Sequence, residues 1–178
     1  MKRTLFLLLL SLLPLLASAS SAAKETLQVR ILTDPTSIYS GDSMLVSVVL
    51  YSSAPVASAS CEGKISIDGK CKVRQLPVDR QGTAGKVREG QSIYYTLVWA
   101  QYVVAPSQAG RVTIPPIRFN ATLQRVVRMP DFFDQMMGAR PEYKETKVSA
   151  TSAPFVVEIK DKPLRSTQEM MRRGSSVL

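Results

Sequence analysis

The sequence predicts an all-β protein, an antiparallel immunoglobulin-like β-sandwich with a short helical or irregular insertion. About seven or eight short runs of strand-forming residues alternate with turn-forming residues, which is typical of a sandwich. The densest apolar block after the N-terminus, residues 92–127, contains three such runs in succession. Pro115 and Pro116 end the second run, because proline has no N–H to donate to a sheet and pushes the preceding residue into extended geometry. We expect this block to form the centre of the sandwich.

The other strands are predicted from the alternation of apolar and polar residues. Residues 27–31 alternate strictly, as in a strand with one face in the core, and residues 155–159 form a similar final strand. Residues 43–51 carry apolar side chains on both faces, which favours a central strand covered on both sides. Residues 52–60 and 79–90 are small or polar and contain proline or glycine, so we predict loops there.

The first 19 residues have the three parts of a secretory signal peptide. A basic start precedes an apolar run over residues 4–16, and the small-residue sequence Ala-Ser-Ala ends at Ala19. Cleavage after Ala22 or Ala23 is the alternative. We therefore predict a periplasmic or secreted protein, with a signal peptide at residues 1–19.

The remaining chain is predicted to be a β-sandwich domain at residues 24–162, followed by a flexible tail at residues 163–178. No stretch after the signal peptide approaches the length of a membrane-spanning helix, so we expect no membrane span in the mature chain. The chain has a formal net charge of +9, with basic residues spread along it. A solvated surface explains this charge more simply than anionic lipid or an acidic partner does. No motif for nucleic-acid recognition is present.

Cys61 and Cys71 are predicted to form a disulfide. They are the only two cysteines, and an exported protein reaches an oxidising compartment. The pair Asp68-Gly69 between them favours a hairpin turn that would bring the two sulfurs together. Such a small closed loop would stabilise the fold by about 2–3 kcal/mol. A thiol-redox role is the alternative, but active dithiols are usually separated by two residues at the start of a helix.

The residue types argue against an enzyme. The chain contains no histidine, which removes the commonest general base and metal ligand. No glycine-rich phosphate loop, nucleophile elbow or close pair of carboxylates is apparent. We therefore predict a non-catalytic protein without a cofactor or a metal ion.

Residues 129–143 interrupt the β pattern and are the insertion of the predicted sandwich. Asp131 can cap a short helix that Gly138 would end. Such a turn would cluster four aromatic or methionine side chains, which either fold back to plug an open end of the sandwich, as we slightly favour, or form a partner-binding surface. The four candidate residues are Phe132, Phe133, Met136 and Met137.

The segment at residues 102–119 resembles the BatD family of bacterial aerotolerance-related exported proteins. The family has a signature of the type Y-x-L-x-P-x-x-x-G-x-x-x-I-P-P, and Pro-Asp-Phe-Phe-Asp at residues 130–134 resembles its DPFF insertion. The close of the chain at residues 152–159 is similar to the end of a family module. The residues that match the signature are Tyr102, Pro106, Gly110, Ile114, Pro115 and Pro116.

The resemblance implies a binding role in the cell envelope. BatD-like proteins are encoded beside MoxR-type ATPases and membrane proteins with von Willebrand A domains, so protein partners of these kinds are implied. Family members usually have several modules and a C-terminal membrane helix, whereas one module is found here, and we do not carry the anchor over. The alternative is a secreted sandwich that binds carbohydrate or envelope polymer through aromatic side chains, although core packing is favoured for these. The aromatic residues are Tyr94, Tyr95, Trp99 and Tyr102.

Overall fold

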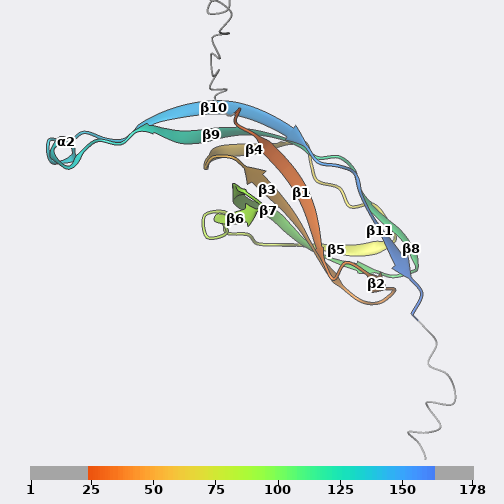
Figure 1. Ribbon diagram of the computed structural model, residues 1–178. Helices are drawn as coiled ribbons and strands as arrows, with labels where there is room; N and C mark the ends of the chain where they lie inside the picture. Colours follow the sequence, from red (N-terminus) through yellow and green to blue (C-terminus); the bar gives the residue numbers. More distant parts are fainter. Residues whose placement is uncertain (1–23, 163–178) are drawn as a thin grey trace, which may run out of the picture.

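A computed structural model describes residues 24–162, and within this range the protein is almost entirely β-structure. The predicted signal peptide at residues 1–19 and the predicted tail at residues 163–178 lie outside the described residues. The all-β, predominantly antiparallel prediction is confirmed. Two layers of strands face each other. The layer that contains β9 and β10 continues into a long two-stranded ribbon (Figure 1).

The first layer is a five-stranded antiparallel sheet with the order β1-β3-β7-β5, in which β6 also pairs with β7. Strand β7 is the longest and pairs with β3 along most of its length. On its other edge β7 pairs with β6 through residues 92–96 and with β5 through residues 101–106. The strands are β1 (Leu27–Asp34), β3 (Met44–Ser52), β5 (Cys71–Leu76), β6 (Gly85–Glu89) and β7 (Ser92–Pro106).

The second layer consists of two three-stranded sheets with the orders β10-β9-β4 and β2-β11-β8. All pairs are antiparallel except β2 with β11. The strands are β4 (Val56–Glu62), β9 (Arg118–Arg128) and β10 (Glu142–Thr151) in the first, and β2 (Ile38–Tyr39), β8 (Gly110–Ile114) and β11 (Phe155–Lys160) in the second.

A proline-rich bend joins these two small sheets. Strand β8 runs into β9 through Pro115 and Pro116, and β10 runs into β11 through the segment that contains Pro154. Ser152 connects the two bends, because its backbone N–H donates to Ile117 O at 2.9 Å and its Oγ accepts from Ile117 N at 2.9 Å. Both residues are buried, so water cannot satisfy their backbone groups. These two bonds provide the partners that the sheet hydrogen bonds no longer supply at the bend. The result is one long hairpin, bent in the middle.

The core lies between the layers and consists of the inward-facing residues of each strand. Strand β3 contributes Met44, Val46, Val48 and Leu50 to the core cluster. Val49 and Tyr51 on its other face are also buried, which fits the predicted central strand. Phe119 at the start of β9 is fully buried and contacts Trp99 edge to face, with ring centroids 5.2 Å apart. The largest fully buried apolar side chains are Phe119, Ile38, Met44, Leu50, Ile114 and Leu123.

A β-bulge at Trp99 reverses the faces of β7. Val48 of β3 lies opposite Ala100. The next β3 residue, Val49, lies opposite Val98, so Trp99 is one extra residue in β7. Because side chains alternate along a strand, the bulge turns Trp99 and Leu97 toward the core.

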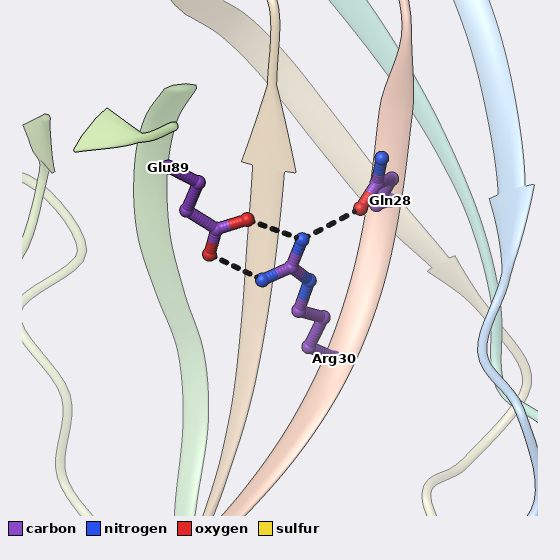
Figure 2. Close-up of polar contacts among 3 residues, drawn as sticks. All are labelled: Gln28, Arg30 and Glu89. Carbon is purple, nitrogen blue, oxygen red and sulfur yellow. Dashed lines mark hydrogen bonds and ion pairs between the residues drawn. The ribbon is translucent and has the colours of Figure 1, made fainter. Parts of the chain in front are cut away.

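The outer face of the five-stranded sheet is bridged by an ion pair between its first and last strands. Arg30 of β1 donates from Nη1 and Nη2 to the carboxylate of Glu89 on β6, at 2.5 and 2.9 Å. It also donates to Gln28 Oε1 at 3.0 Å (Figure 2). The guanidinium lies 4.2 Å above the ring of Tyr51. The hydrogen bonds from Arg30 lower the pKa of Glu89, and those to Glu89 raise the pKa of Arg30.

Three sequence predictions are corrected by the structure. Residues 56–60 of the predicted loop at 52–60 belong to the strand β4 (Val56–Glu62), and residues 85–89 of the predicted loop at 79–90 form β6. The predicted hairpin between the cysteines does not form. Instead the chain crosses from the sheet of β4 to that of β5. On the way, Asp68 forms an isolated bridge with Thr113 of β8.

The predicted disulfide between Cys61 and Cys71 is not present: both are free thiols. The hairpin on which the prediction depended does not form, and the two cysteines lie in different sheets. Cys61 lies in β4 opposite Phe119, and Cys71 lies in β5 opposite Pro106.

Candidate interaction site

The predicted insertion forms the tip of a two-stranded ribbon. Strands β9 and β10 continue beyond the layer they pair in, and the short helix α2 (Phe132–Met136) closes their far end, away from the rest of the sandwich (Figure 1). The helix begins and ends as predicted. The Asp131 carboxylate accepts from Asp134 N at 2.7 Å, which is a standard N-cap bond, and Gly138 follows the last turn with φ of 89°.

The four candidate side chains are exposed on this tip. The exposed fraction is 80% for Phe132, 68% for Phe133, 72% for Met136 and 77% for Met137, and no residue of α2 is buried. The favoured expectation, that they plug an open end of the sandwich, is therefore wrong. The helix lies at the end of the ribbon, where no other layer of the described residues covers it.

The exposed apolar surface continues onto the ribbon. Met129 is 70% exposed, and three more apolar or aromatic side chains of β9 and β10 are about half exposed. We call these residues together the tip patch: Val126, Val127, Met129, Phe132, Phe133, Met136, Met137 and Tyr143. Soluble proteins rarely expose so many large apolar side chains in one place unless the surface binds something.

Charged residues support the base of the ribbon. Arg125 Nε lies 2.8 Å from the Glu25 carboxylate, whose side chain is mostly buried, and this ion pair ties the ribbon to the start of the domain. Nearer the tip, Arg128 lies 4.0 Å from Glu142 on the facing strand. Both acidic residues near the helix, Asp131 and Asp134, are at its N-terminal end, where negative charge is favourable. The ribbon thus carries ion pairs at Arg125 and Arg128 beside its exposed apolar residues.

The aromatic residues of β7 are largely occupied by contacts within the domain. Tyr102 is buried, and burial raises the pKa of its hydroxyl. The guanidinium of Arg80 covers the ring of Trp99 at 3.8 Å, and Lys86 lies 5.0 Å from the centre of the Tyr95 ring. Tyr94 contacts Tyr51 edge to face. This arrangement gives no support to sugar stacking by these rings.

The two cysteines have the surroundings of structural thiols. Each is partly buried against the core, and this burial raises the pKa of both Cys61 and Cys71. A raised pKa leaves less of the reactive thiolate at neutral pH. Within residues 24–162, no group of three or more cysteine or acidic side chains is placed to hold a metal ion.

Scans against protein-family models, curated proteins and solved structures find no match for this chain. The resemblance to BatD therefore rests on the sequence motifs alone. In the described part of the chain, no helix is long and apolar enough to cross a membrane.

Proposed function

We propose that this protein is an exported, non-catalytic interaction module that binds a protein partner through the tip patch. The observation that carries the proposal is the exposure of Phe132, Phe133, Met136 and Met137 at the end of a ribbon that projects from the sandwich. Aromatic side chains dominate binding energy in protein interfaces, and methionines adapt to the shape of a groove. A partner with an apolar groove would bury these side chains as it does an amphipathic helix.

The sequence resemblance supplies the setting of this proposal. A BatD-like protein would act in an envelope complex concerned with aerotolerance or stress, beside a MoxR-type ATPase and membrane proteins with von Willebrand A domains. The soluble domain of such a von Willebrand A protein is the partner we would test first.

A binding comparison tests the proposal. The native protein and the double variant Phe132→Ser/Phe133→Ser are used to capture partners from envelope extracts and to titrate a purified von Willebrand A domain. Val156→Ser serves as the matched control, because Val156 is also an exposed apolar residue, 52% exposed, but lies on β11 away from the ribbon. We expect the double variant to lose binding at least about tenfold, since a truncated interface aromatic costs 1–2 kcal/mol or more, and the control to bind normally.

Two results would contradict the proposal. One is equal binding by the native protein and the double variant. The other is sedimentation of the native protein with phospholipid vesicles, lost in the double variant, without capture of any protein. The second result would assign the tip patch to a membrane surface.

A further inference from the structure

The two seams between the layers of the sandwich differ. Along one seam β1 packs beside β10, and the ion pair between Arg125 and Glu25 closes it. Along the other, β4 is the last strand of its sheet and pairs only with β9 among the described strands. A cleft of about 550 Å³ opens on this second seam. Its volume falls in the range of ordinary ligand sites.

The walls of this seam cleft come from both layers. One wall is the start of β4, including Val56 and Ala57. The other is the part of β7 from Tyr95 to Trp99, together with the loop that carries Arg80. On the edge that faces this cleft, β7 has no strand partner at residues 97–100, between the start of β6 and the end of β5. The bulge at Trp99 turns this part of β7 inward, so the cleft has an apolar floor.

The outer edge of β4 can accept another strand. An edge strand presents a row of unpaired backbone N–H and C=O groups, which proteins usually protect with lysine, proline or a bulge. Strand β4 has neither lysine nor proline, and its only charged residue is Glu62 at the end. Its one irregularity lies between Val56 and Ser58. Beyond it, residues 58–62 form a regular edge about 17 Å long, which matches about five residues of added strand.

The charge of the cleft selects an acidic occupant. Arg80 is its one charged lining residue. The Arg80 guanidinium lies over the Trp99 ring, 3.8 Å from its centroid, and its Nε donates to Trp99 O at 3.5 Å. Within the described residues no carboxylate lies within 4.0 Å of it. A guanidinium oriented by stacking on an aromatic ring can still pair with a carboxylate through its edge. The chain's own residues 163–178 carry three arginines against one glutamate and are not complementary.

We propose that the seam cleft binds an extended acidic peptide of a partner protein, which adds as a strand to the outer edge of β4. An apolar side chain of the peptide enters against Trp99 and Leu97. A carboxylate two residues along points the same way, since alternate residues of a strand share a face, and it pairs with Arg80. The site uses no residue of the tip patch and does not depend on the function proposed for that patch.

The test uses a synthetic seven-residue peptide, acetyl-Thr-Val-Thr-Leu-Thr-Glu-Thr-amide, and its counterpart with lysine in place of glutamate. We expect the native protein to bind the glutamate peptide about fivefold more tightly, in line with an exposed ion pair. Arg80→Glu should reverse this preference. Ala57→Trp and Ala84→Trp fill the cleft from opposite walls at exposed positions, and each should weaken binding at least about tenfold.

Amide hydrogen exchange locates the peptide. Bound glutamate peptide should slow exchange at residues 58–62 of β4, and Phe132→Ser/Phe133→Ser should bind it as the native protein does. The proposal is overturned if the native protein shows no charge preference at millimolar peptide, or if protection falls outside β4. It is also overturned if an oligogalacturonate binds in an Arg80-dependent way and the peptide does not, which would make the cleft a site for acidic polysaccharide.

Discussion

Replacement of Ser152 by alanine tests how the long hairpin is held at its bend. Ser152 is 5% exposed, and its Oγ accepts the backbone N–H of Ile117, which is itself 5% exposed. Alanine removes the acceptor and leaves that N–H buried without a partner. An unsatisfied buried donor costs about 1–3 kcal/mol, more than the net gain of an average hydrogen bond. For a domain of this size, such a loss corresponds to a fall in Tm of about 3–10 °C.

Urea denaturation followed by tryptophan fluorescence measures this loss, because Trp99 is the only tryptophan and packs on the core. Ser149→Ala is the matched control, since Ser149 is an exposed serine of β10, the strand that ends immediately before Ser152. We expect Ser152→Ala to lose 1–3 kcal/mol and the control to stay within about 0.5 kcal/mol of native. Equal stability of the two variants would refute the claim that the Ser152 hydroxyl satisfies the Ile117 N–H at the bend.

Three further predictions concern the core, the loss of stability at acidic pH and the reactivity of the two thiols. Leu123→Ala should destabilise the fold by about 2–5 kcal/mol, because Leu123 is 1% exposed; urea denaturation checks this, and a loss below 1 kcal/mol would place the side chain outside the core. The lowered pKa of Glu89 means that its pair with Arg30 stabilises the fold above the ordinary glutamate pKa and loses that contribution as the pH falls through the lower folded pKa. The Tm difference between native protein and Glu89→Gln should therefore shrink from about pH 7 to about pH 2; a constant difference would argue against the pair. Cys61 and Cys71 should react with maleimide more slowly at pH 7 than a free cysteine does, because burial raises both pKa values, and labelling as fast as in unfolded protein would contradict this.

The sequence predicted the centre of the fold because there the local and long-range signals agree. The apolar run of β7, the turn after it and the Pro115-Pro116 stop appear where the residue types place them. The helix of the insertion was also predicted, since the Asp131 cap and the Gly138 end are local features.

Strands β4 and β6 were not predicted, because each contributes little apolar surface to the core. Strand β4 does alternate at residues 58–62, but its inward side chains are small, and β6 has mainly exposed side chains, so neither gives a strong apolar signal. Their positions are set by pairing with β9 and β7. The bulge at Trp99 depends equally on register with β3, which one strand's sequence does not contain.

The residue types indicated which side chains form the candidate site. They did not indicate whether these side chains face the core or the solvent. The residue types singled out four aromatic and methionine side chains, and the structure places all four exposed on or next to α2. Whether they turn inward or outward depends on how far β9 and β10 extend beyond the rest of the sandwich, and this length is set by contacts with β4 and β1 that are distant in the sequence. The cysteines show the same limit, since an Asp-Gly pair favours a hairpin but does not require one.

Site-specific photo-crosslinking at the tip patch tests the central proposal most directly. A photoreactive phenylalanine analogue replaces Phe133 in one preparation and Val156 in another, and both are irradiated in envelope extract. The proposal predicts a crosslinked protein of defined size from position 133 only, which disappears when excess native protein competes but persists with excess Phe132→Ser/Phe133→Ser. Identical products from both positions, or crosslinks from position 133 to phospholipid alone, would contradict it.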